Sequence, residues 1–92
     1  MIALEDRLRI ASRARLRFDE KTKGWLLVYP ERGLSLADTA ANILQLCDGT
    51  RTVSGVVDEL AKKYEGAPRD VLEKDVLLFL GSMDERALLE RV

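Results

Sequence analysis

Residues Gly24–Gly49, GWLLVYPERGLSLADTAANILQLCDG, carry the pattern that decides the fold. Aromatic, aliphatic and β-branched side chains fill Trp25–Tyr29 and stop at Pro30, which cannot continue a β-ladder, so this run predicts a strand. After a turn containing glycine, Leu34–Leu36 alternate like a second strand with one face in solvent. The two strands are therefore expected to pair as a hairpin.

A helix is expected directly after this second strand. Ser35, followed three residues later by Asp38, has the form of an N-terminal capping box, so the strand passes into the helix almost without a loop. Asp48–Gly49 is a typical C-terminal stop for a helix. The apolar stripe of this helix comprises Leu36, Ala40, Ile43, Leu44 and Cys47.

The chain before Gly24 adds one more strand. In Arg15–Asp19, the leucine and phenylalanine share one face and the arginines share the other, which predicts a half-buried strand. A polar turn then folds the next strand back, so three antiparallel strands are expected. Residues 1–13 have no clear fold signal; we predict an N-terminal arm, mobile or briefly helical, ahead of a single domain at residues 14–92.

Two further helices are predicted after Gly49. Thr52 is the expected N-cap of the first, whose apolar stripe recurs at helical spacing. Pro68 suits the first position of the second, which continues to Asp84. The last six residues fit either a final helical turn or a short strand. The stripe of the first of these helices is Val53, Val56, Val57, Leu60, Ala61 and Tyr64.

The last helix is too apolar to have only one buried face. Its core stripe is predicted at Leu72, Val76, Phe79, Leu80 and Met83. At about 100° per residue, a second strip runs beside this stripe and mixes apolar with polar side chains. This flanking strip fits either the rim of the core or one wall of a groove. It comprises Val71, Asp75, Leu78 and Ser82, with Lys74 at its margin.

The element order predicts an α+β fold close to a winged helix-turn-helix, in which a three-stranded antiparallel sheet is followed by three helices. With 92 residues, of which 47% are hydrophobic, the chain can form one small core. No apolar stretch approaches the roughly 20 residues that span a bilayer, so no membrane association is predicted. The single cysteine cannot form an internal disulfide, which favours the cytoplasm.

Charge and composition argue against two functional classes. The net charge of −1 is unlike that of a nucleic-acid binder, and acidic and aliphatic side chains on the last helix would not suit phosphates, so a winged-helix DNA-binding regulator is a minor alternative. The chain has no histidine and no known catalytic motif, and Cys47 has no base beside it. We therefore predict no enzyme activity, no cofactor and no metal site.

Peptide recognition fits the pattern better. The Leu34–Leu36 strand comes last in the predicted sheet, so one of its edges can present unpaired N–H and C=O groups. An extended peptide could add there as a further strand, with its side chains against the last helix. Exposed edges can also pair with each other, so a monomer and a strand-exchanged homodimer both remain open.

Several of these segments resemble the PqqD family, which acts in the biosynthesis of the redox cofactor pyrroloquinoline quinone (PQQ). The likeness runs from Arg15 to Arg91, through RLRFDEKTKGWLLVYPERGLSL, AANILQLCDGTRTVSGVVDELAKKY, DVLLFL and ALLER. Its most specific parts are the strand end Trp25–Glu31 and the junction Leu46–Val53. Ala37 departs from the family pattern, where a polar residue such as asparagine is expected, and this leaves the start of the helix open.

The resemblance implies a peptide chaperone without a cofactor. Such proteins are recognition elements for ribosomally made, modified peptides (RiPPs): they bind the precursor peptide PqqA as an added strand and deliver it to the radical SAM enzyme PqqE. The alternative function is that of a recognition element in another pathway for ribosomally made, modified peptides. Carried onto this sequence, the peptide-binding residues are Arg32, Gly33, Leu34, Ser35 and Leu36 on one wall, and Val71, Lys74, Asp75, Leu78 and Ser82 on the other.

Overall fold

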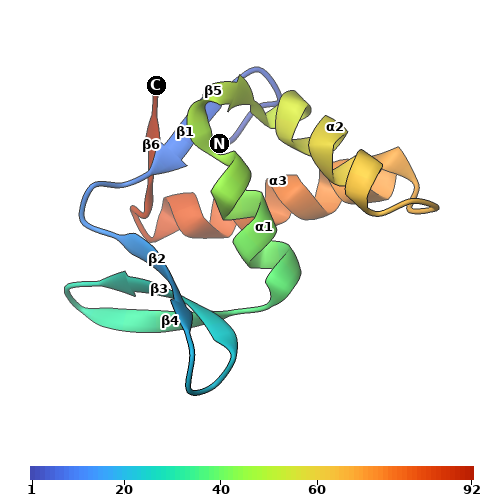
Figure 1. The fold of residues 1–92 in the computed structure, drawn as a ribbon. Helices are drawn as coiled ribbons and strands as arrows, with labels where there is room; N and C mark the ends of the chain where they lie inside the picture. The colour runs from blue at the N-terminus through green and yellow to red at the C-terminus, as the bar shows by residue number, and fades with distance from the viewer.

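Six strands and three helices form the structure, a computed structural model that describes residues 1–92 (Figure 1). Antiparallel sheets combined with three helices confirm the predicted α+β class. The elements are β1 (Arg7–Ile10), β2 (Arg15–Asp19), β3 (Gly24–Tyr29), β4 (Arg32–Leu36), α1 (Asp38–Leu46), β5 (Asp48–Thr52), α2 (Val53–Lys63), α3 (Arg69–Glu85) and β6 (Leu89–Arg91).

The predicted meander is present as a sheet of order β2-β3-β4. Leu27 of β3 lies opposite Leu16 of β2 and Leu34 of β4, and its side chain is fully buried. Phe18 and Trp25 pack edge to face, with ring centroids 5.3 Å apart. Leu16 and Leu27 thus lie against the core, as the alternation predicts, whereas Phe18, predicted on the same face as Leu16, is 42% exposed.

A second sheet, of order β5-β1-β6, was not expected from the sequence. The segment expected to be an arm contains β1, and Leu8 within it is only 1% exposed. Arg7–Ile10 does alternate with period two, but four residues are too few to distinguish a strand from an arm. Both partner strands come from distant parts of the chain, so no local pattern could reveal the pairing.

Two local predictions at helix starts had different outcomes. The capping box at Ser35 is wrong, because Ser35 and Leu36 stay in β4 and the N-cap of α1 is Ala37, which makes no side-chain cap hydrogen bond. At α2 the predicted N-cap is confirmed, since Thr52 Oγ1 accepts a hydrogen bond of 3.1 Å from the N–H of Gly55.

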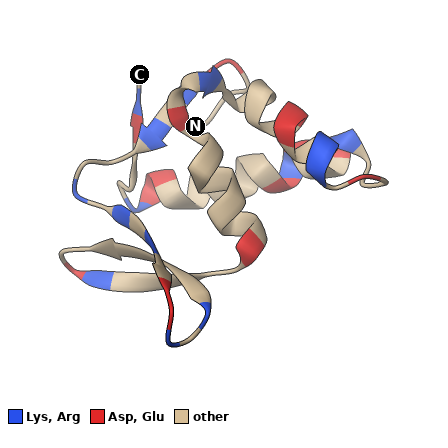
Figure 2. Ribbon diagram, viewed as in Figure 1, with Lys and Arg blue, Asp and Glu red and all other residues tan.

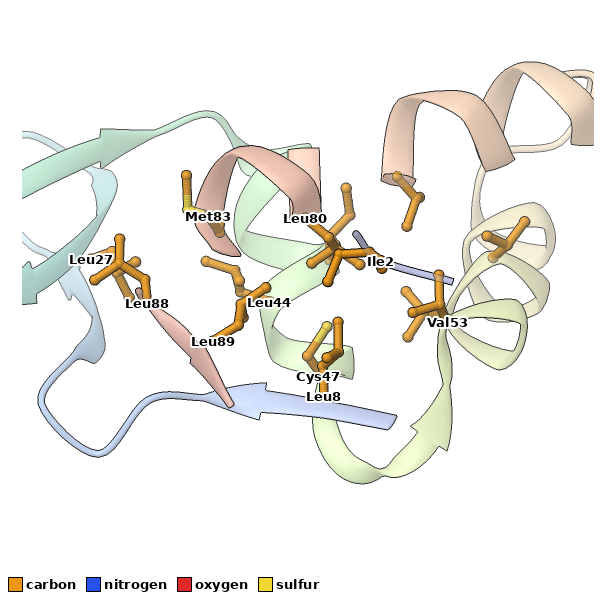
Figure 3. Close-up of a cluster of buried hydrophobic side chains, with 14 of the residues drawn as sticks. Ile2, Leu8, Leu27, Leu44, Cys47, Val53, Leu80, Met83, Leu88 and Leu89 are labelled. Atoms are coloured by element: carbon orange, nitrogen blue, oxygen red, sulfur yellow. The ribbon is translucent and has the colours of Figure 1, made fainter. Parts of the chain in front are cut away.

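The core is one cluster that joins both sheets to all three helices. Figure 3 shows Leu27 and Leu88 at one end of the cluster and Val53 at the other. α1 contacts β5 of the second sheet and every strand of the first, so it connects the two ends of the fold. No polar or charged residue is buried, and stability therefore rests on apolar packing.

The turn that starts β5 depends on the carboxylate of Asp48. Its Oδ1 accepts hydrogen bonds from the Thr50 hydroxyl (2.7 Å) and from the Thr50 N–H (2.9 Å), and Oδ2 pairs with Arg51. These hydrogen bonds, chiefly those from Thr50, lower the pKa of Asp48 to about 2. The folded state is thus stabilised by the ionised form of this side chain.

We expect Asp48→Asn to lower the free energy of unfolding at pH 7 but not at pH 2. A carboxyl group with an unfolded pKa of about 3.9 and a lower folded pKa stabilises the fold above pH ~4 and loses this effect as pH falls through about 2. Urea denaturation at pH 7, 4, 3 and 2 measures the difference between variant and parent. Glu65→Gln, at an exposed site, serves as the control. A difference for Asp48→Asn that does not change with pH would contradict this account.

Candidate functional site

The outer edge of β4 has no partner strand, because β4 pairs only with β3. A two-residue turn separates Tyr29 from Arg32. In a hairpin with such a turn, the two residues that close it exchange backbone hydrogen bonds, whereas the next pair, Val28 and Gly33, does not. The alternation then directs the backbone N–H and C=O groups of Leu34 and Leu36 toward β3. The corresponding groups of Gly33 and Ser35 point outward, away from the sheet.

From Gly33 to Leu36, the side chains of β4 alternate between solvent and the core. Leu34 and Leu36 are half-buried and pack against the core cluster. Arg32, Gly33 and Ser35 are exposed, and a Cβ added at Gly33 would have no atom within 4 Å. The edge therefore combines outward backbone groups with an open surface above them.

The flanking strip of α3 lies at the surface. Val71 is 48% exposed and Leu78 is 64% exposed, and both are among the few large apolar side chains in contact with solvent. Lys74 and Asp75 are also exposed, whereas Ser82 is half-buried. The opposite side of α3 faces the core through Val76, Leu80 and Met83, as predicted.

The structure does not bring β4 and the flanking strip together in one cavity. None of its four surface cavities is lined by residues of both elements. A strand added to β4 would lie about 4.8 Å from it, on an open surface rather than inside a cavity. The pairing of β4 with the strip as the two walls of a peptide site thus stays a prediction.

Arg13 connects the tip of the β3–β4 hairpin to the end of α3, and nothing in the sequence indicated this role. Its guanidinium donates to the carbonyl oxygens of Arg86 (2.9 Å) and Ala87 (3.3 Å) just after α3. It also pairs with Glu31 in the hairpin turn and lies 5.8 Å from the centroid of the Tyr29 ring. The hydrogen bond from Arg13 holds the pKa of Glu31 below its usual value. Arg13 thereby links the β3–β4 turn to the segment that follows α3.

The largest cavity, of about 660 Å³, lies along α3 beside the N-terminal segment, and the sequence reasoning did not identify it. Two of the predicted peptide-binding residues, Lys74 and Leu78, line this cavity rather than one next to β4. We call it the α3 groove. Its lining comprises Met1, Ile2, Asp70, Glu73, Lys74, Leu77, Leu78, Gly81, Asp84 and Glu85.

Chemically reactive groups are few. Burial raises the pKa of the Cys47 thiol to about 12, with a smaller contribution from the neighbouring Asp48 carboxylate, so the thiolate is not available near neutral pH. No group of three or more histidine, cysteine or acidic side chains is placed to hold a metal ion. None of the three helices has the length and apolar character to cross a membrane.

Comparison with known proteins points to one family. The family model described as coenzyme PQQ synthesis protein D (PqqD) matches residues 24–89. A PqqA binding protein of Rhodopseudomonas palustris (strain BisB5) is 45% identical over 76 residues, which are 83% of this chain and 74% of that protein.

Two solved structures are similar in fold. The PqqD truncation of Methylobacterium extorquens PqqCD, described as a stand-alone RiPP recognition element, has a TM-score of 0.85 at 35% identity. The superposition covers 99% of this chain and 96% of that one. TbiB1 in complex with the TbiA(beta) leader peptide has a TM-score of 0.76 at 19% identity, covering 89% and 94% of the two chains, and shows likeness of fold alone.

Proposed function

The chain belongs to the PqqD family, and from that premise we propose that it binds a PqqA-like precursor peptide as a strand added to β4 and presents it to a PqqE-like radical SAM enzyme. The relatives named for binding PqqA support the choice of peptide. The fusion of PqqD to PqqC in Methylobacterium extorquens PqqCD supports a role beside enzymes of PQQ synthesis.

The observation that carries this proposal is the free edge of β4. Gly33 and Ser35 each offer one N–H and one C=O, so an added strand can form up to four backbone hydrogen bonds. At a net 0.5–1.5 kcal/mol each, these contribute roughly 2–6 kcal/mol. One or two apolar side chains buried against Val71 and Leu78 would bring the total near the −8 kcal/mol of a micromolar complex.

The proposed role is binding without catalysis. By holding a flexible peptide in one extended conformation near an active site, the chain raises the local concentration of substrate for the enzyme. The relatives named for binding PqqA and the buried, unreactive Cys47 thiol support this role. We infer that the chain acts in the cytoplasm, where a single reduced cysteine is ordinary.

Titration of a fluorescently labelled PqqA-like peptide, and separately of a random DNA duplex, each at two salt concentrations, tests the proposal. We expect micromolar or tighter peptide binding with weak dependence on salt, and no specific DNA binding. Binding of DNA that falls steeply with salt, together with no binding of peptide, would instead support a winged-helix regulator.

Leu78→Asp is expected to weaken peptide binding about 10- to 100-fold with little change in melting temperature. A carboxylate at this exposed position costs the free protein little but would be desolvated beneath a bound peptide. Val92→Asp, at a position with similar exposure (65%) at the C-terminus, is the matched control and is expected to retain peptide affinity. A large drop in melting temperature for Leu78→Asp would place this side chain in the core instead.

A further inference from the structure

The α3 groove has an apolar floor between acidic side chains. Leu77, Leu78 and Gly81 of α3 face Ile2 of the N-terminal segment across it. Carboxylates lie toward both ends of the helix, with Asp70 at one end and Glu85 at the other. Figure 2 shows acidic segments toward both ends of α3.

Most of these carboxylates have no partner within the chain. Asp84 lies 3.4 Å from Arg91, but Asp70, Glu73 and Glu85 form no ion pair. The only basic side chain in the lining is that of Lys74. Unpaired negative charge beside exposed apolar surface is complementary to a partner that carries basic residues around an apolar face.

Gly81 is unusual for its place in the interior of α3. Glycine has the lowest helix propensity of any residue except proline. No packing constraint within the chain explains it, since a Cβ added there would have no atom within 4 Å. A glycine that opens into the groove allows the backbone of a second element to approach α3 closely.

The wall opposite α3 does not offer a row of free backbone groups. Leu4 O accepts a hydrogen bond of 2.9 Å from Ser54 N, and Met1 O accepts one of 3.0 Å from Arg91. An added strand is therefore disfavoured here, in contrast to β4. At 1.5 Å per residue, Asp70 to Glu85 spans about 22 Å, the length of roughly four helical turns.

We propose that the α3 groove docks a basic amphipathic helix of the enzyme that receives the peptide. This inference rests on the proposed function, because a chaperone whose β4 edge holds the peptide also needs a surface for the enzyme. The α3 groove shares Lys74 and Leu78 with the predicted peptide-binding residues, and its other lining residues lie outside that set. The apolar side chains of the helix would lie on Leu77 and across Gly81, and its basic side chains would pair with Glu73 and Glu85.

Two variants test this docking without using residues of the predicted peptide site. Glu73→Lys/Glu85→Lys reverses the charge of the groove, and Gly81→Gln fills its floor while favouring the helix. Glu20→Lys/Glu65→Lys makes the same change in net charge at exposed sites elsewhere. Calorimetric titration with purified PqqE-like enzyme and anisotropy with labelled PqqA-like peptide give separate affinities for each chain.

Both groove variants are expected to lose at least tenfold in affinity for the enzyme and to bind the peptide within twofold of the parent. The control is expected to match the parent in both titrations. Enzyme affinities within twofold of the parent for both groove variants, or no binding of the enzyme by the parent itself, would overturn the proposed docking. A parent dimer that the groove variants convert to monomer would overturn it in favour of a second copy of this chain. Failure of the parent to bind the peptide would instead contradict the proposed function.

Discussion

Ser35→Pro is expected to weaken binding of the precursor peptide about 5- to 150-fold while leaving the fold intact. The substitution removes an N–H that points away from the sheet, so no hydrogen bond between β3 and β4 is lost. In the complex it leaves a peptide carbonyl without its donor, at a cost of about 1–3 kcal/mol. Circular dichroism and peptide anisotropy on the same sample measure both effects.

Two neighbouring variants separate the backbone effect from other causes. Ser35→Ala keeps the N–H and is expected to bind the peptide as the parent does. Leu34→Pro removes an N–H that points toward β3, so it is expected to disrupt the sheet and lower the melting temperature. If Ser35→Pro were fully folded and bound the peptide with parental affinity, addition of a strand at this edge would be wrong.

Leu8→Ala is expected to lower the free energy of unfolding by about 2–5 kcal/mol, because it removes buried methyl groups and leaves a cavity in the core. Leu8 is 1% exposed and packs in the cluster that joins β1 to the helices. A domain of this size has a total stability of only about 5–10 kcal/mol, so the variant is expected to be partly unfolded at 37 °C. Urea denaturation monitored by circular dichroism measures the change.

Leu78→Ala makes the same chemical change at a position that is 64% exposed. It is expected to alter the free energy of unfolding by less than about 0.5 kcal/mol, as surface substitutions usually do. A small effect at Leu8, comparable with that at Leu78, would mean that the first residues are an arm that contributes nothing to the core.

The sequence predicts best those elements whose signals are local. Trp25–Tyr29, the stripe of α2 and the cap at Thr52 each carry their signal within a few residues, and the structure contains all three elements. The second sheet has no such signal, because β1, β5 and β6 are short and their pairing joins distant segments. The capping box failed because Ser35 pairs in β4 and is not free to cap.

In the candidate site, too, the sequence predicts the features that have a local signal and misses those that depend on contacts between distant segments. Strand order predicts the free edge of β4, and helical spacing predicts that Val71 and Leu78 lie beside the core stripe. The link from Arg13 to Arg86 spans much of the chain, and the α3 groove depends on where the N-terminal segment lies. Neither could be predicted, although Leu77, an apolar residue outside both predicted strips of α3, hints at the groove.

Amide hydrogen exchange followed by NMR, with and without saturating precursor peptide, tests the central claim most directly. The amides of Leu34 and Leu36 are expected to be protected in the free protein, and those of Gly33 and Ser35 to become protected only when the peptide binds. The opposite edge of the sheet is the internal control, because the amides of Leu16 and Phe18 on β2 are expected to stay unchanged. Unchanged exchange at Gly33 and Ser35 in the saturated complex would contradict the account, whether or not β2 became protected instead.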